Sequence, residues 1–171
     1  METDLLYGRG HLTIRLPDDL EVTTVRKRAM PRLENPALKI AEAFRSPSSC
    51  PPLRQLAHTR KTACILVCDI TRPVPHAELL PPLIEALLSG GIAKENILIL
   101  VATGLHRPNE GDELREVIGS DRIFRSIPIA NHFARDRAAH ADLGRTASGK
   151  PGCSPDRAAA SPWAFRRTTA R

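Results

Sequence analysis

The sequence predicts an α/β fold, in which a Rossmann-like parallel sheet follows an N-terminal β-hairpin region and precedes an irregular C-terminal tail. Two continuous apolar runs, at residues 63–68 and 97–102, have the composition of buried strands. A segment with helical character follows each run, and this alternation favours a parallel sheet with right-handed crossovers. The length of 171 residues suits one domain, or one domain with a tail.

The N-terminal region is expected to be β structure. Residues 5–7 and 11–16 alternate apolar and polar side chains around the turn Gly8-Arg9-Gly10, as the strands of a hairpin do. A second turn leads to an expected third strand at residues 21–25, and a polar connector follows.

Two helices are expected before the first apolar run. Asn35 and Pro36 predict the start of a helix that reaches about Arg45, because Asn is a favoured N-cap and Pro fits the first helical position. After a loop rich in Ser and Pro, a short helix is expected at residues 53–58. The apolar side of the first helix is expected to contain Leu38, Ile40, Ala41 and Phe44.

The run at residues 63–68 is expected to be covered on both faces, which would bury the thiols of Cys64 and Cys68. These residues would lie about 13 Å apart along one strand, too far for a disulfide. The four cysteines form neither a CxxC pair nor a Cys/His ligand spacing. No metal site and a reducing, cytoplasmic location are therefore expected.

The helix after the first apolar run is expected to reach about Leu88. Pro81 and Pro82 lack the N–H that a helix interior requires, so they are expected to start or kink this helix. Ser89-Gly90-Gly91 is a typical helix end.

The second apolar run is expected to lead through a loop at residues 103–109 into a helix at residues 110–118. Gly119 is expected to end that helix. Residues 122–130 are expected to contain a third strand of the sheet.

Residues 152–171 are expected to form an irregular or disordered basic tail after a domain of residues 1–151. Four arginines and one aspartate in residues 151–171 account for much of the net charge of +6. No stripe of Lys and Arg with interleaved aromatics is visible, so nucleic-acid binding is not expected. No signal peptide and no apolar run of the ~18 residues that span a bilayer is visible, so no membrane association is expected.

Polar side chains follow the first apolar run directly. Asp69, Thr71 and Arg72 would lie at the carboxyl end of a strand, where open α/β sheets bind ligands. The guanidinium of Arg72 can hold a carboxylate or phosphate through two parallel hydrogen bonds. Asp69 can orient Arg72 or accept a ligand hydroxyl. The alternative is an Asp–Arg pair that only fastens a turn.

A second polar loop follows the second run. His106 is a candidate general base at neutral pH, and Gly104 permits close approach of a ligand to the backbone. The alternative is an exposed loop histidine without a role. His132 is interpreted as a hydrogen-bonded structural residue. Residues 144–150 fit half of a phosphate-binding loop, but Pro151 follows in place of Ser or Thr, so we reject that function.

The two loops together resemble the N-terminal domain of the nickel-dependent lactate racemase family. The residues that carry the resemblance are Asp69-Ile70-Thr71-Arg72-Pro73-Val74-Pro75, Ala102-Thr103-Gly104-Leu105-His106-Arg107-Pro108 and Asn131-His132, in this order. The resemblance covers residues 5–151.

The resemblance implies a 2-hydroxy-acid racemase or epimerase that acts on a small substrate such as lactate. In this family a nickel pincer nucleotide takes a hydride from the substrate Cα while a histidine removes the hydroxyl proton. His106 matches the first catalytic histidine of the family, and Arg72 matches its substrate-side arginine. Asp69, Thr71 and Gly104 match positions that would place the cofactor or the substrate.

The sequence departs from the family after the matched region. The segments that carry the second acid–base histidine, the lysine that tethers the cofactor and the nickel ligand are absent, as is a C-terminal domain. We therefore expect this chain to be inactive alone, and we hypothesise that a frameshift or premature stop replaced the continuation near Gly152. The alternative is a non-enzymatic remnant or a small carboxylate- or phosphate-binding module.

Overall fold

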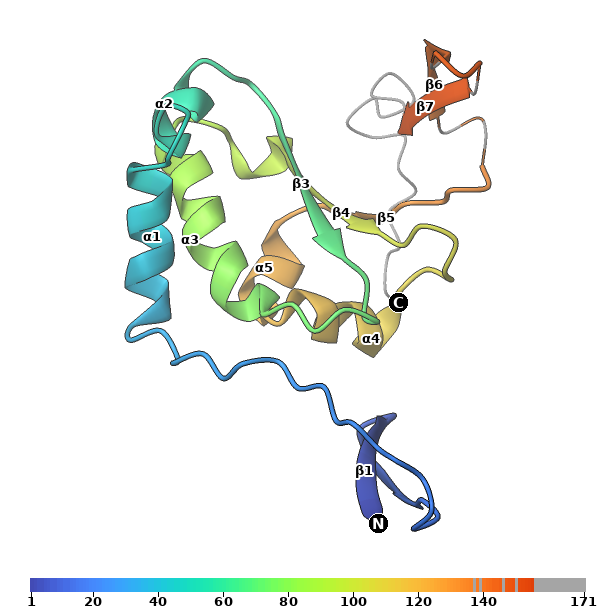
Figure 1. Ribbon diagram of the computed structural model, residues 1–171. Helices are drawn as coiled ribbons and strands as arrows, with labels where there is room; N and C mark the ends of the chain where they lie inside the picture. The colour runs from blue at the N-terminus through green and yellow to red at the C-terminus, as the bar shows by residue number, and fades with distance from the viewer. Residues whose placement is uncertain (137, 139, 146, 150, 156–171) are drawn as a thin grey trace. The chain divides into compact units, whose positions relative to one another are not determined.

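The computed structural model describes residues 1–136, 138, 140–145, 147–149 and 151–155 (Figure 1). The chain divides into two compact units, Met1–Arg32 and Leu33–Arg171. In the part of the chain that is described, no helix is both long enough and apolar enough to cross a bilayer.

The first unit contains the hairpin that the sequence predicts. Strand β1 (Glu2–Tyr7) pairs antiparallel with β2 (Gly10–Arg15), and Gly8 at the turn adopts a φ of 56°, which suits glycine. The third strand expected at residues 21–25 is wrong, because these residues form no strand. Val25 is 92% exposed, so a strand there would bury too little apolar surface to be stable.

The second unit contains the predicted parallel sheet. Strands β3 (Ala63–Cys68), β4 (Ile97–Ala102) and β5 (Ile129–Asn131) lie in the order β3-β4-β5, and all neighbouring pairs are parallel. A short 3-10 helix, Lys94–Asn96, precedes β4. The expected α/β class with a Rossmann-like sheet is therefore confirmed.

Helices cover one face of this sheet (Figure 1). Helix α3 (His76–Ser89) connects β3 to β4, and helices α4 (Gly111–Ile118) and α5 (Asp121–Ser126) connect β4 to β5. Helices α1 (Pro36–Arg45) and α2 (Leu53–His58) contact α3. The buried cluster that joins strands and helices contains Ile65, Val67, Leu80, Ile84, Leu87, Ile97, Ile99, Val101, Leu114, Val117, Ile118 and Ile123.

Only one face of β3 is buried, so the expectation that both faces are covered is wrong. Ile65 and Val67 belong to the core, whereas Cys64, Leu66 and Cys68 are exposed. The thiols that we expected to be buried are therefore accessible. The cause is the topology, because successive right-handed crossovers that advance in one direction place their helices on the same face.

Helix α3 begins at His76, so Pro81 and Pro82 lie inside it rather than at its start. Each proline removes one backbone hydrogen bond from the helix. The helix tolerates this loss because Leu80 and Ile84, on the same turns, are buried against the sheet. The predicted end is confirmed, since Gly90 is the C-cap.

Helix α1 has the predicted bounds but not the predicted cap. Asn35 is at the N-cap position with a φ of 51°, and its side chain makes no capping hydrogen bond. A capping side chain normally requires an extended N-cap backbone, which this left-handed conformation does not provide. Leu38, expected on the apolar side, is exposed, whereas Ile40 and Phe44 are half-buried.

We expected a strand within residues 122–130, but residues 122–126 belong to a helix that we did not expect. Helix α5 ends at Ser126, and the strand is confined to Ile129–Asn131. Ser120 caps α5, because its Oγ accepts a hydrogen bond from the backbone N–H of Ile123 at 3.4 Å. The Ser-Asp pair at this point of the sequence is a helix-start signal that explains the difference.

The irregular tail expected from residue 152 is wrong for residues 152–155. Strand β6 (His140–Arg145) pairs antiparallel with β7 (Pro151–Pro155), so this region forms a hairpin. Residues 156–171 lie outside the described residues, and the domain boundary at 151/152 stays a prediction. The rejected phosphate-loop motif lies in this hairpin and not between a strand and a helix.

Gly119 ends α4 and is expected to tolerate no side chain. It has a φ of 66°, and a Cβ on it would lie 2.8 Å from the Cβ of Ala77 in α3. Gly119→Ala is therefore expected to lower the free energy of unfolding by about 1–3 kcal/mol, measured by urea denaturation. Gly111→Ala is the control, because Gly111 has a similar φ of 55° and open space beside it. If both variants lost the same free energy of unfolding, the close approach of Gly119 to α3 would make no contribution to the loss.

Candidate functional site

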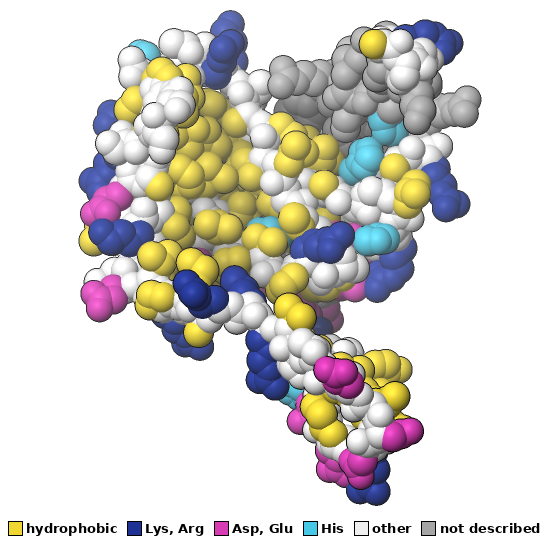
Figure 2. All heavy atoms as spheres, viewed as in Figure 1, with side chains coloured by type: hydrophobic (Ala, Val, Ile, Leu, Met, Phe, Trp, Pro, Cys, Tyr) yellow, Lys and Arg dark blue, Asp and Glu magenta, His cyan; other side chains and the backbone are white. Residues whose placement is uncertain are grey.

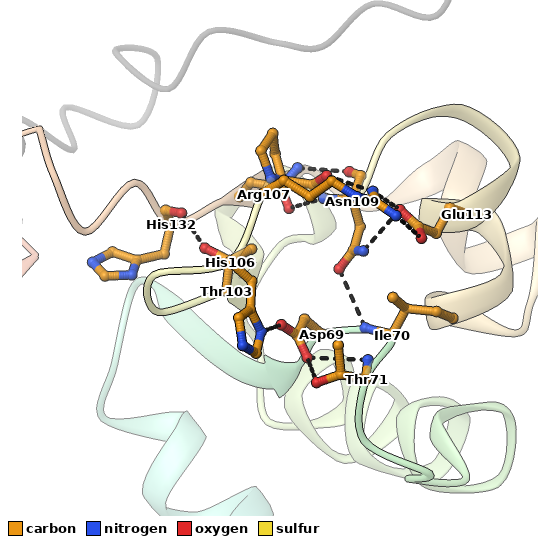
Figure 3. Close-up of polar contacts among 11 residues, drawn as sticks. Asp69, Ile70, Thr71, Thr103, His106, Arg107, Asn109, Glu113 and His132 are labelled. Carbon is orange, nitrogen blue, oxygen red and sulfur yellow. Dashed lines mark hydrogen bonds and ion pairs between the residues drawn. The ribbon is translucent and has the colours of Figure 1, made fainter. Parts of the chain in front are cut away.

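Two polar loops lie side by side at the carboxyl ends of the strands. The loop at residues 69–75 follows β3, and the loop at residues 103–109 follows β4. Cys68 and Ala102, the last residues of the two parallel strands, are in register. The side chains that follow these strands are therefore neighbours, at the edge where open α/β sheets bind ligands (Figure 3).

The structure brings together Asp69 and His106, one from each loop. Nδ1 of His106 lies 2.5 Å from Oδ2 of Asp69 (Figure 3). Asp69 is 4% exposed, whereas the side chain of His106 is 54% exposed. The imidazole is thus anchored on a buried carboxyl group and still reaches solvent. His106 is not the unattached loop histidine that we considered as an alternative.

The second oxygen of Asp69 is held within its own loop. Oδ1 accepts hydrogen bonds from the Thr71 hydroxyl at 2.6 Å and from the Thr71 backbone N–H at 3.2 Å. Burial would raise the pKa of Asp69, but the hydrogen bonds from Thr71 and His106 outweigh it and lower this pKa.

The ionised state of Asp69 determines which nitrogen of neutral His106 carries the proton. A carboxylate only accepts hydrogen bonds, so Nδ1 of His106 must be the donor. Nε2 of the neutral ring then has a lone pair. The pair therefore has the arrangement of a general base that a carboxylate orients.

Arg72 is placed differently from the expectation. Its backbone N–H donates to the carbonyl of Asp69 at 3.1 Å, which closes a turn. Its side chain is exposed, and no ion pair with Asp69 occurs among the described residues. The interpretation of an Asp–Arg pair that fastens the turn is therefore wrong, and the guanidinium can serve an external anion.

Gly104 and Thr103 shape the turn that presents His106. The backbone N–H of His106 donates to the carbonyl of Thr103 at 3.0 Å, and Gly104 has a φ of 59°. A Cβ on Gly104 would meet nothing within 4 Å, so the backbone is open on that side. Thr103 is buried and its hydroxyl donates to the carbonyl of His132. The turn is therefore attached to the end of β5.

Asn109 is a structural residue of the site that sequence reasoning missed. It is 2% exposed, and its Oδ1 accepts from the backbone N–H of Ile70 at 3.3 Å. Its backbone N–H donates to Oδ1 of Asn131 at 3.0 Å, and Nδ2 of Asn131 donates to the carbonyl of Asn109 at 2.8 Å. Asn109 therefore connects the ends of all three strands (Figure 3).

Arg107 is committed to a local ion pair. Its guanidinium donates to both carboxylate oxygens of Glu113, at 2.5 and 2.8 Å. Hydrogen bonds from Arg107 and from Asn109 lower the pKa of Glu113 to about 2. Arg107 therefore stabilises the loop, which leaves Arg72 as the better candidate for binding an anion.

His132 lies at the end of β5 and contacts the hairpin β6–β7. Its Nε2 lies 3.0 Å from Nε2 of His140, and Nδ1 of His140 lies 2.6 Å from the carbonyl of Asp136. A carbonyl only accepts, so Nδ1 of His140 donates, and Nε2 of His132 donates to Nε2 of His140. Protonation of the pair would remove the hydrogen bond between the rings.

This contact is expected to weaken as the pH falls. Burial, and secondarily the charge of His140, lowers the pKa of His132 from its ordinary value of 6.5. A lowered pKa means that the contribution to stability is present above 6.5 and is lost as the pH falls through the lowered value. Tryptic cleavage after the exposed Arg135 is expected to accelerate between pH 7.5 and 5, relative to a peptide standard. The acceleration should be absent in His140→Gln; its persistence there would contradict this account.

The described residues contain no group of three His, Cys, Asp or Glu side chains that could hold a metal ion. The polar groups of the two loops are instead an imidazole, a carboxylate, a hydroxyl and a guanidinium. This set suits the binding of a small anion and the transfer of a proton.

Comparison with known proteins places the chain in a family. The model of the lactate racemase N-terminal domain matches residues 7–159, beyond residue 151 where we expected the resemblance to end. Lactate racemase from Thermoanaerobacterium thermosaccharolyticum is 30% identical over 122 residues, which are 70% of this chain and 28% of that protein. Lactate racemase from Lactiplantibacillus plantarum is 33% identical over 111 residues, which are 64% of this chain and 26% of that protein.

A solved structure agrees with these matches. The lactate racemase apoprotein from T. thermosaccharolyticum aligns with a TM-score of 0.67 and 25% identity, over 91% of this chain and 36% of that chain. This chain spans about a quarter of the length of the curated relatives that it matches. The two loops, the parallel sheet and these matches agree, and the chain belongs to the lactate racemase N-terminal domain family.

Proposed function

We propose that this chain provides the acid–base and carboxylate-binding part of a 2-hydroxy-acid racemase or epimerase. The relatives that share its N-terminal domain are lactate racemases, so lactate is the first candidate substrate. The hydrogen bond between Asp69 and His106 is the observation that carries the proposal, because it orients a solvent-accessible imidazole as a general base.

His106 would transfer the proton of the substrate hydroxyl. Nε2 accepts this proton, and the imidazolium that forms is stabilised by the buried carboxylate of Asp69. The same nitrogen returns the proton in the reverse direction. Thr71 donates both its hydroxyl and its N–H to Asp69, so its proposed role is to hold that carboxylate rather than to bind the substrate.

Arg72 would bind the substrate carboxylate. Its exposed guanidinium follows Thr71 in the same loop and has two parallel N–H groups for the two carboxylate oxygens. Gly104 leaves the backbone beside His106 open, which would allow a ligand to approach closely. The chain would thus fix both polar groups of a 2-hydroxy acid.

The remaining step, transfer of hydrogen at the substrate Cα, requires a group that the described residues do not provide. The resemblance implies a nickel pincer nucleotide, but no three potential metal ligands converge in the described part of the chain. The residues present therefore do not fit the metal of this cofactor, and we derive no reaction step through it. We propose that the chain is inactive alone for this reason.

Binding of lactate to the isolated chain tests the proposal without any cofactor. Titration with D- or L-lactate is expected to shift the NMR signals of the His106 ring and of the Arg72 guanidinium. Arg72→Gln is expected to weaken binding about tenfold, since it removes charge-assisted hydrogen bonds. Arg125→Gln in α5 is the control and should bind as the unchanged chain does.

The titration also distinguishes the alternative function. A chain that only binds anions would respond equally to acetate, phosphate and lactate, with the His106 signals unmoved. That result would favour a non-enzymatic carboxylate- or phosphate-binding module and contradict the proposal.

A further inference from the structure

We infer that the uncovered face and free edge of β3 dock a second α/β unit, formed by the part of a racemase polypeptide that lies outside the match to this chain. This inference rests on the family and the fold and is independent of the proposed proton transfer. We call the surface the open sheet face and define it by Cys64, Leu66 and Cys68 of β3 together with Leu98 and Ala102 of β4.

The open sheet face is apolar, and it is accessible over β3. The register pairs Cys64 with Leu98, Leu66 with Leu100 and Cys68 with Ala102 on the face opposite the helices, and of these Leu100 is buried at 4% exposed. Leu66 is 68% exposed at its centre. Figure 2 shows further hydrophobic side chains gathered over α1, α3 and the adjoining edge of β3, the side on which the helices pack. Parallel sheets are normally covered on both faces, so an accessible leucine on the open sheet face indicates a missing layer.

The edge of β3 is also incomplete. Strand β3 pairs with β4 on one side, and no strand pairs with its other side among the described residues. The unit β3-α3-β4-α4/α5-β5 corresponds to one half of a doubly wound fold. The second half of such a fold begins beside the first strand of the first half, and its helices cover the opposite face. One occupant would therefore fill both the edge and the open sheet face.

The length of the relatives supplies enough polypeptide for this occupant. The matched regions are 28% and 26% of the two curated lactate racemases and 36% of the solved apoprotein chain. Most of each relative therefore lies outside the match, which is sufficient for several strands and helices. The occupant is this unmatched part of a racemase, and it needs the same surface whether it is covalently linked to this chain or not.

A second copy of this chain would fit less well. Two copies related by a two-fold axis would pair their β3 edges antiparallel, which would place their 69–75 loops at opposite ends of the joined sheet. A parallel strand of a second unit would instead end beside Asp69. In doubly wound folds, ligands bind in the crevice formed at this point of the sheet. The docked unit would therefore complete the crevice that contains Asp69 and His106.

Thiol labelling tests this inference on the unchanged chain. Cys68 lies on the open sheet face, and Cys50 lies in the exposed loop between α1 and α2. In the chain alone a maleimide is expected to modify both at similar rates. After co-expression with the portion of the T. thermosaccharolyticum lactate racemase outside the match, a complex should co-purify. In that complex, modification of Cys68 should slow at least tenfold while Cys50 stays reactive.

A matched pair of variants locates the contact. Leu66→Glu is expected to abolish the complex and the protection of Cys68, because it places a charge in the centre of the docked face. Leu88→Glu alters an exposed leucine of α3, on the helix-covered side of the sheet, and should leave both unchanged. Circular dichroism checks that both variants fold, and the labelling of the unchanged chain needs no variant.

Four results would overturn the inference. They are a failure of the complex to form, a complex in which Cys68 stays reactive, slow labelling of Cys68 in the chain alone, and a Leu66-dependent homodimer. The third result would show that another part of this chain covers the face, and the fourth that a second copy does. None of them bears on lactate binding by Arg72 and His106.

Discussion

Asp69→Asn is expected to change the tautomer of neutral His106, so that the ring proton moves from Nδ1 to Nε2. In the unchanged chain, Oδ1 of Asp69 accepts both hydrogen bonds from Thr71, and Oδ2 accepts from Nδ1 of His106. An asparagine would direct its carbonyl oxygen to the Thr71 donors and its NH₂ group to His106. Nδ1 would then have to accept, the proton would move to Nε2, and the base would lose its outward lone pair.

Nitrogen-15 NMR of the imidazole ring measures this change directly. At a pH where the ring is neutral, the unchanged chain should show a protonated Nδ1, and Asp69→Asn a protonated Nε2. In an enzyme completed with its missing part, turnover should fall roughly 10²–10⁴-fold, the usual contribution of general acid–base catalysis. Asp121→Asn, which alters an exposed carboxylate of α5, is the control. A protonated Nδ1 in both variants would contradict the proposed role of Asp69.

Asn109→Ala is expected to be among the most destabilising single changes in the site. It would remove the Asn109 side chain as acceptor from Ile70 and as donor to Glu113. Because Asn109 is almost fully buried, the groups left behind would lose partners that water cannot easily replace. The free energy of unfolding is expected to fall by about 2–4 kcal/mol.

Urea denaturation measures this loss, and a double-mutant cycle locates its origin. Glu113→Ala should also destabilise, and the double variant should lose less than the sum, because Nδ2 of Asn109 donates a hydrogen bond to the Glu113 carboxylate at 3.0 Å. The control is Asn96→Ala, which alters an exposed asparagine of the 3-10 helix. A loss below about 0.5 kcal/mol for Asn109→Ala, typical of a surface change, would contradict its role as the link between strand ends.

The sheet could be predicted because its strands are distinctive in sequence. The runs at β3 and β4 are continuous and apolar, and a connection of this length requires a crossover helix, so their parallel order follows from local pattern and chain topology. The same reasoning correctly placed the polar loops at one edge of the sheet. Both steps depend on neighbours in sequence or on general rules of topology.

The incorrect predictions concern features that depend on the surroundings. The β-branched residues at 21–25 are compatible with a strand, but they pair with neither strand of the hairpin, and Val25 stays exposed. Leu66 has the composition of a buried residue, and its exposure follows from the placement of three helices on one face. The composition of a segment shows whether it is compatible with a strand or with burial, and the elements that pack against it determine whether the strand forms and is buried.

The sequence identified candidate residues for the site but not the contact between Asp69 and His106. Spacing indicated Asp69, Arg72 and His106 as candidates, and it left Asp69 either to orient Arg72 or to accept a ligand hydroxyl. The structure pairs Asp69 with His106 because parallel strands in register bring the two loops together. Asn109 could not be found from a local pattern, because its partners lie on β5 and in two other segments.

The most direct test of the account is the interconversion of D- and L-lactate by this chain combined with the missing portion of a lactate racemase and its cofactor. The account predicts interconversion by the unchanged chain in this assembly, and a loss of at least about 10²-fold in His106→Ala, the lower range for a general base. His58→Ala, which alters an exposed histidine of α2, should retain activity. Equal rates in His106→Ala and the unchanged chain would contradict the claim that His106 is the acid–base group of this site.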